Sequence, residues 1–328
     1  MKALLLLALP LLFSSQVRAL EVLTTIKPLQ LIASAITDGM NEPELLLAPG
    51  TSPHDYALRP SDVRRLNQAD LVVWVGPELE GFLTPLLAGK DNSLALLALV
   101  EPEGHDHHNG QEQGGDHHNP HGHHEHHDEH DHQDEHHTGK ISVKDQDDDH
   151  DHDHGDKDPH IWLDPHHGER IATLLAERLS LLDPANAERY QRNLATFRTE
   201  LAKTDSAVAE RLAPARGKGY FVFHDAYGYW EDHYQLPALG HFTVNPERAP
   251  GAQTVGRIHQ ALREAQAECV FAEPQFRPAV VEAVVRNTQA RIGILDPLAT
   301  DIAAGPRGYF AFMQQMAAAM AGCLLNES

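Results

Sequence analysis

Residues 183–214 read DPANAERYQRNLATFRTELAKTDSAVAERLAP and carry the most regular helical pattern of the chain. Asp183 and Pro184 suit the N-cap and the first position of a helix, and Pro214 suits its end. Between them, apolar side chains recur at spacings of three, four and seven residues, at Tyr190, Leu194, Phe197, Leu201, Val208 and Leu212. We therefore expect a helix from Pro184 to Leu212, about 44 Å long, that joins two lobes as a stiff rod.

Short apolar runs and helical stretches alternate on both sides of this helix, which is typical of parallel α/β sheets. Before it, the pattern predicts strands at 22–26, 44–47, 71–75 and 94–97, and helices at 29–36, 61–68 (capped by Ser61) and 78–87. After it, we expect strands at 220–223, 238–242, 270–272 and 292–295, and helices near 254–266, 279–288 and 309–321. The predicted α/β protein has an N-terminal lobe (20–182), a connecting helix (183–213) and a C-terminal lobe (214–328), each lobe a mainly parallel sheet flanked by helices.

The N-terminus has the pattern of a secretory signal peptide. Met1 and Lys2 precede an apolar stretch, residues 3–13, that is too short and too interrupted by Pro10 to span a bilayer, and small residues follow at 17–19. Residues 1–19 are therefore expected to be cleaved, leaving a soluble exported protein that begins near Leu20. Its two cysteines, Cys269 and Cys323, are expected to form a disulfide, worth about 4 kcal/mol in the chain-entropy model. The alternative is that the thiols bind metal, but their spacing is not that of a close metal-binding pair.

Residues 101–158 form a tract that cannot build a core, with 17 histidines, 19 acidic residues and three lysines in 58 positions. Imidazoles beside carboxylates are ligands for divalent metals, zinc above all, so the tract indicates metal handling rather than a plain solvated linker. The tract supplies most of the formal net charge of −22. The rest of the chain has no basic stripe, which argues against a nucleic-acid partner.

Three of the eight histidines outside the tract lie where α/β proteins place ligand groups, in loops at the carboxyl ends of strands. His54 follows the expected strand 44–47, His160 opens the ordered segment after the tract, and His224 ends the expected strand 220–223. Each alone is more typical of a hydrogen-bonded structural histidine, but together they could meet on one metal ion in a cleft between the lobes. His166 and His167 are expected to cap or cover a helix, and His233, His241 and His259 to lie on the surface or in packing.

Two acidic residues end strands of the second lobe, and their carboxylates could reach the same cleft. Asp296 could be a fourth metal ligand, an acceptor for the ring N–H of a ligand histidine, or a helix cap. Glu273 raises the same question. The sequence pattern leaves these alternatives open.

Several motifs together resemble the zinc-binding periplasmic components of ABC uptake transporters, the ZnuA type. The resemblance covers nearly the whole chain after the leader. It is carried by PHDYALRPSDV (53–63), ADLVVWVG (69–76), HIWLDP (160–165), FVFHDAYGYW (221–230), HFTVNPE (241–247), FAEPQFRPAVVE (271–282) and LDPL (295–298).

The resemblance implies two α/β lobes joined by a long helix, with metal in the interlobe cleft and a His-rich loop before the second ligand. By match to the motifs, the implied ligands of Zn²⁺ are His54, His160 and His224. Some members carry a Glu before the first histidine, where this chain has Pro53, so water or Asp296 must complete the shell. Three neutral imidazoles favour zinc over manganese, which prefers oxygen ligands.

The expected function is therefore zinc capture in the periplasm and delivery to an inner-membrane permease, by a monomer that does not contact the ATPase of the transporter. The tract would act as a low-affinity zinc antenna or as a sensor of excess zinc. Two alternatives remain: a zinc storage or buffering protein, and an exported zinc hydrolase, because three histidines with an open fourth position also describe a hydrolytic zinc site.

Overall fold

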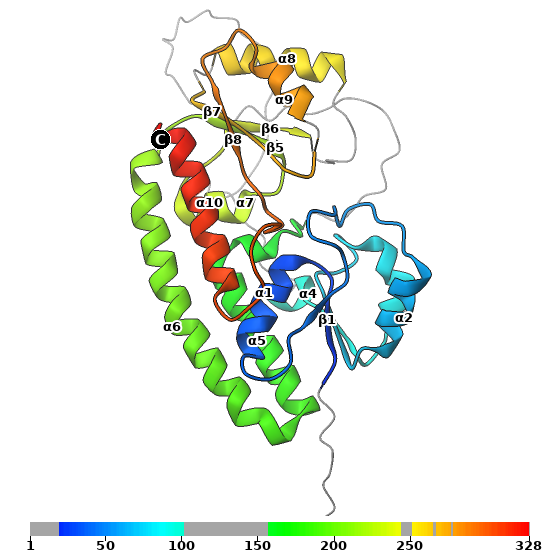
Figure 1. Cartoon of the computed structure of the whole chain (residues 1–328). Coiled ribbons are helices and arrows are strands. Elements are labelled where there is room, and N and C mark those ends of the chain that lie inside the picture. Colours follow the sequence, from blue (N-terminus) through cyan, green and yellow to red (C-terminus); the bar gives the residue numbers. More distant parts are fainter. Residues whose placement is uncertain (1–19, 102–156, 244–250, 265–266, 277, 328) are drawn as a thin grey trace, which may run out of the picture.

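A computed structural model describes residues 20–101, 157–243, 251–264, 267–276 and 278–327 of the 328-residue chain. The expected signal peptide, nearly all of the His-rich tract and residues 244–247 of the HFTVNPE motif lie outside the described residues. Within them, the predicted fold class is confirmed, because two parallel sheets are flanked by helices and a long helix runs along the molecule (Figure 1). No described helix combines the length and the apolar character needed to cross a bilayer.

Both sheets have four strands and the same strand order. The first consists of β1 (Val22–Thr24), β2 (Glu44–Leu45), β3 (Leu71–Trp74) and β4 (Ser93–Ala95) in the order β2-β1-β3-β4. The second consists of β5 (Tyr220–His224), β6 (Gly240–Thr243), β7 (Cys269–Ala272) and β8 (Arg291–Ile294) in the order β6-β5-β7-β8. All neighbouring strands are parallel, so the carboxyl ends of each sheet lie along one edge, where α/β proteins bind ligands.

Successive side chains of the central strands alternate between two hydrophobic cores, as the period of a strand requires. In β5, Tyr220 and Val222 belong to a large core that also contains residues of the first sheet. Phe221 and Phe223 point to the opposite face, into a smaller core of the second sheet alone. The residues of β3 alternate in the same way between the large core and a small core of the first sheet. The two sheets thus share one core, and each has a second core of its own.

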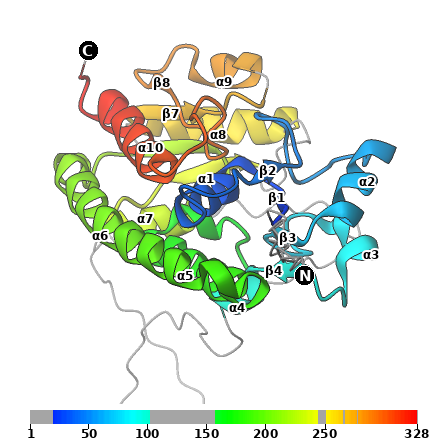
Figure 2. The same ribbon diagram turned by 60° about the horizontal axis from the view of Figure 1, so that its bottom comes forward.

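Ten α-helices are found in the described residues. They are α1 (Lys27–Ile36), α2 (Pro60–Gln68), α3 (Thr84–Leu87), α4 (Leu97–Val100), α5 (Pro165–Leu182), α6 (Ala187–Leu212), α7 (Gly228–Tyr234), α8 (Ala252–Glu264), α9 (Pro278–Val285) and α10 (Gly308–Leu324). Helices α2 and α3 cover the small core of the first sheet, and α8 and α9 cover that of the second. Helices α1, α5, α6 and α10 pack on one another around the shared core (Figure 2).

The long helix α6 buries the predicted apolar residues, from Tyr190 to Leu212, and Thr204 with them. It begins later than predicted, because a 3-10 turn at Pro184–Asn186 precedes it. The Asp183 side chain does not cap the backbone N–H groups of the helix. Its carboxylate instead accepts hydrogen bonds from the side-chain amide of Asn186 (2.7 Å) and from the Tyr190 hydroxyl (3.2 Å). The 26 residues of α6 span about 39 Å. Since α6 packs along both α5 and α10, it braces both halves of the molecule.

Other sequence expectations differ from the structure mainly at the ends of elements. Residues 94–97 were expected to be a strand, but Leu97 already begins α4, and residues 78–87 form a turn, a 3-10 segment and the short α3. Helix α2 is not capped by Ser61. The cap is at Arg59, whose backbone N–H donates to the Asp62 carboxylate at 2.9 Å.

The predicted disulfide is confirmed, with Cys269 and Cys323 joined at an S–S distance of 2.06 Å. It ties β7 of the second sheet to α10, which also packs on α1 and α6. The C-terminal helix is therefore attached to the second sheet while it contacts the helices of the first. The alternative that these thiols bind metal is wrong.

We expect Phe197→Ala in α6 to lower the free energy of unfolding by about 3–5 kcal/mol, because it removes a fully buried ring. Phe197 packs against Tyr309 and Phe310 of α10, with ring centroids 5.9 and 5.2 Å away. Thr199→Ala, at an exposed position of the same helix, should change stability by less than about 0.5 kcal/mol. Urea unfolding of both variants measures this; equal effects would contradict the bracing role of α6.

Candidate metal centre

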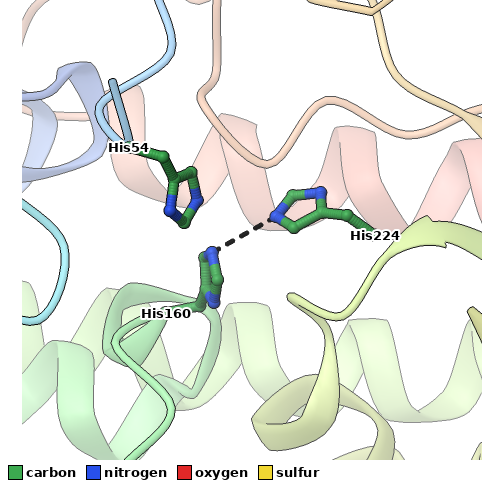
Figure 3. A group of neighbouring side chains, drawn as sticks. All are labelled: His54, His160 and His224. Carbon is green, nitrogen blue, oxygen red and sulfur yellow. Dashed lines mark hydrogen bonds between the residues drawn. The ribbon is translucent and has the colours of Figure 1, made fainter. Parts of the chain in front are cut away.

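The structure brings the three predicted histidines together in one cluster. His54 lies in the loop after β2, His160 just before a 3-10 turn at Ile161–Leu163, and His224 at the carboxyl end of β5. Their ring centroids are 5.2–5.7 Å apart, and one donor nitrogen from each ring lies within 4.8 Å of the others. Figure 3 shows the rings pointing toward a common centre from three separate segments. Two of the segments belong to the first half of the chain and one to the second.

Carboxylates fix the orientation of two of these rings. Nδ1 of His160 is 2.6 Å from Oδ1 of Asp158, and Nδ1 of His224 is 2.6 Å from Oε1 of Glu273. A carboxylate accepts a hydrogen bond, so in a neutral ring Nδ1 carries the proton and Nε2 is left with its lone pair. Both carboxylates therefore leave the Nε2 atoms of His160 and His224 able to bind a metal ion.

The two Nε2 atoms of His160 and His224 are 3.3 Å apart (Figure 3). With both protons on Nδ1, neither Nε2 can donate to the other, and two lone pairs face each other across a buried space. Two ligands at about 2.0–2.1 Å from a tetrahedral zinc ion are about 3.4 Å apart, which is close to the observed separation. The spacing therefore suits a shared cation rather than a hydrogen bond.

His54 completes the cluster as a neutral ring. Burial, together with the neighbouring His160 and His224 rings, lowers its pKa to about 2. Gly50 turns the loop that carries His54 through a backbone φ of 77°, a conformation that favours glycine. A neutral imidazole is the form that binds metal, so His54 needs no proton removed before it can act as a ligand.

The walls around the three rings are largely apolar. They include Pro53, Trp162, Phe276, Pro297 and Leu298. The Trp162 indole N–H donates to the Pro297 carbonyl at 2.7 Å, which links the segment after His160 to the loop after β8. Such walls limit the access of water and strengthen the attraction between a cation and its ligands.

Asp296 lies outside this cluster in the structure. One oxygen of its carboxylate accepts from the Gln275 side chain (2.7 Å) and the Leu298 backbone N–H (3.1 Å), and the other accepts from the Thr300 backbone N–H (2.6 Å). Of the three roles left open by the sequence, these contacts match the cap of a turn. Pro53 supplies no ligand atom from its side chain.

The two carboxylates that contact the histidine rings, those of Asp158 and Glu273, were only weakly indicated by the sequence. The position of Glu273 after β7 raised the question of a role in the cleft, where Oε1 of its carboxylate contacts Nδ1 of His224 at 2.6 Å. Asp158 falls within the tract, which holds so many acidic residues that no single one of them stands out. The remaining signal was the spacing of two residues between Asp158 and His160, which lets the same carboxylate also accept from the His160 backbone N–H at 2.9 Å.

Comparison with known proteins places this chain in a family. The family model for ZnuA, zinc-uptake complex component A, periplasmic, matches residues 22–323. The chain belongs to the ZnuA family. The high-affinity zinc uptake system protein ZnuA of Yersinia pestis is 44% identical over 310 residues, covering 92% of this chain and 91% of that protein. The protein of the same name from Haemophilus ducreyi is 40% identical over 304 residues, covering 93% of each.

Solved structures show the same fold. A crystal structure of a ZnuA matches with a TM-score of 0.65 at 24% identity, covering 92% of this chain and 99% of that one. The laminin-binding protein Lmb of Streptococcus agalactiae, described as having adhesin and metal transporting activity, matches with a TM-score of 0.70 at 19% identity, covering 93% and 100%. The two-lobed architecture of the ZnuA family is thus present in this chain.

We expect Glu273→Gln to weaken zinc binding about 10- to 100-fold, because it removes the charge that orients and polarises His224. Isothermal titration with zinc, in competition with a chelator, measures the affinity. Glu282→Gln removes the same charge from an exposed position on α9 and should leave the affinity within about twofold of the unmodified protein. Equal affinities of the Glu273 variant and this control would contradict the orienting role.

In the absence of zinc, the stability of the protein should fall as the pH drops below about 6.5, the pKa of histidine in an unfolded chain. The folded state keeps His54 neutral down to a pKa of about 2, so between these values the unfolded state binds more protons. This one residue should make the free energy of unfolding change by up to about 1.4 kcal/mol per pH unit in this range.

Urea unfolding between pH 7.5 and pH 5, with a chelator present, measures the slope for the unmodified protein and for His54→Gln. The variant has no imidazole at position 54, so its stability should depend less steeply on pH. Identical slopes would show that His54 is protonated as readily in the folded state as in the unfolded chain.

Proposed function

We propose that this protein is the periplasmic zinc-binding component of an ABC transporter, which captures Zn²⁺ in the cleft between its two sheets and delivers it to an inner-membrane permease. The observation that carries the proposal is the convergence of His54, His160 and His224. Nδ1 of His160 and Nδ1 of His224 are each hydrogen-bonded to a carboxylate. Membership of the ZnuA family supports it. The named zinc uptake proteins that resemble the chain support zinc as the cargo.

The chemistry of the donor set favours zinc over manganese. Three imidazole nitrogens and one water make the tetrahedral shell that zinc accepts, whereas manganese prefers oxygen ligands. The carboxylates nearest the rings, of Asp158 and Glu273, are hydrogen-bonded to ring nitrogens, and that of Asp296 holds its own loop. A metal in this cluster would therefore be bound mainly by nitrogen.

The division of the ligands between the two halves gives a route to release. His54 and His160 belong to segments of the first half, and His224 ends a strand of the second sheet. A small separation of these segments removes one ligand from the ion, which lowers the affinity without unfolding either sheet. The shared core and the α6 and α10 helices resist a large opening, so we infer that release needs only a local movement of the cleft walls.

The contacts of the candidate bases argue against a zinc hydrolase. A hydrolytic site needs a general base within reach of the metal-bound water. Asp55 and Asp225 are exposed, and Asp225 lies 3.5 Å from His241. We therefore infer that the protein is not an enzyme. We further propose that it is exported by cleavage of residues 1–19, acts as a monomer, and contacts the permease but not the ATPase.

A storage or buffering protein would need only the tract, nearly all of which lies outside the described residues. The two ends of the tract lie near each other, because Lys157 Nζ donates to the Glu101 carbonyl at 3.3 Å, so a short flexible linker can take the place of residues 102–156. The Tyr229 hydroxyl also donates to the Glu101 carboxylate (2.6 Å) and contacts the Asp158 carbonyl (3.0 Å). A protein that lacks residues 102–156 is therefore a suitable test of the cleft alone.

We expect the protein without residues 102–156 to keep one tight zinc site and to lose it when His224 is changed to alanine. The loss should be at least about 100-fold in affinity, since one of three protein ligands is removed. Zinc titration against a chromophoric chelator measures it. The matched control is His259→Ala, which removes an imidazole that donates from Nδ1 to the Val284 carbonyl at 2.7 Å. Absence of a tight site after removal of the tract would favour the buffering function instead.

A further inference from the structure

A second group of metal-binding side chains lies where α5, α6 and α7 meet. His233 of α7 is at its centre, with Asp164 before α5 on one side and Asp205 of α6 on the other. His166, in the first turn of α5, packs its ring against that of His233, with centroids 5.0 Å apart at 72°. None of these four residues belongs to the cluster of His54, His160 and His224.

One nitrogen of His233 is fixed by Asp205. The distance from His233 Nε2 to Oδ1 of Asp205 is 2.8 Å, and the same oxygen accepts from the Tyr234 hydroxyl at 2.9 Å. Asp205 therefore holds the proton of a neutral His233 on Nε2 and leaves the lone pair on Nδ1. This is the relation that Glu273 has to His224 in the cleft, with the two ring nitrogens exchanged.

The free nitrogen of His233 faces a carboxylate. Nδ1 is 3.6 Å from Oδ2 of Asp164, which is too long for a hydrogen bond. Two ligands of one tetrahedral zinc ion are about 3.4 Å apart, so the pair is spaced as ligands that share a cation. The other oxygen of Asp164 is occupied by the backbone N–H groups of His166 (2.6 Å) and His167 (2.9 Å), which hold the carboxylate in place.

The exposed His166 ring can supply a third ligand. In the described residues, only the cleft histidines form a group of three with all donor atoms within 4.8 Å, so His166 must rotate toward His233 to bind with it. An exposed side chain changes rotamer at little cost.

We propose that His233, Asp164 and His166 form a second, weaker binding site for a borderline divalent ion such as Zn²⁺ or Co²⁺, with Asp205 orienting His233. An ion bound there would connect the start of α5, which packs on α1 of the first half, to α7, which follows the first strand of the second sheet. It would thus cross-link the two halves of the molecule away from the cleft.

The test uses the protein without residues 102–156, whose remaining ends are hydrogen-bonded to each other and to Tyr229. The protein is first loaded with one equivalent of zinc, which fills the cleft, and is then titrated with Co²⁺. We expect one further equivalent to bind, with visible absorption bands of a four-coordinate cobalt ion.

In His233→Gln the second equivalent should be lost, and in His166→Ala its affinity should fall at least about tenfold, while both variants keep the first equivalent of zinc. His259→Ala should retain both equivalents. The proposal is overturned if no second equivalent binds, or if the second equivalent is unchanged in His233→Gln. Because the first equivalent is measured in the same experiment, a failure of the cleft site is distinguished from a failure of this one.

Discussion

The site depends on one electrostatic constraint, namely that electron-rich nitrogens must be held together in a space that contains little water. His160 and His224 point their Nε2 lone pairs at each other at 3.3 Å, an arrangement that is unfavourable until a cation lies between them. The hydrogen bonds of Asp158 and Glu273 impose this arrangement by keeping the ring protons on the far side. Part of the free energy of folding thus holds the two Nε2 atoms in an arrangement that a bound metal ion stabilises.

The fold supplies the rigidity that this constraint requires. A core shared by both sheets, four mutually packed helices and the Cys269–Cys323 disulfide hold the halves in one arrangement. Because the strands of each sheet are parallel, the loops after their carboxyl ends lie along one edge, and His54 and His224 from the edges of the two sheets meet in the cleft. The ligands are therefore positioned by ordinary packing far from the metal, while the local hydrogen bonds set only the direction of each ring.

Much of this arrangement could be predicted from the sequence, because it rests on periodicity and on the position of residues at strand ends. The apolar spacing of α6 identified its buried face, and His54 and His224 stood out because each follows a strand. Features that depend on side-chain partners could not be predicted. The 3-10 turn before α6 arises because the Asp183 carboxylate binds Asn186 and Tyr190, and the loop after β8 is closed because Asp296 binds Gln275 and Thr300.

The same limit applies to the tract and to the histidines beyond the cleft. Composition shows that residues 101–158 can bind metal, but it cannot show that Asp158 belongs to the folded site rather than to the tract. Nor can it show that His233, 67 residues after His166, packs against it. In both places a carboxylate fixes the orientation of a histidine ring: Asp158 orients His160, and Asp205 orients His233. The orientation of the imidazoles, and not their mere presence, therefore separates a metal site from a polar surface. The orientation of each ring is fixed only when the helices and loops pack together, so it cannot be read from the sequence.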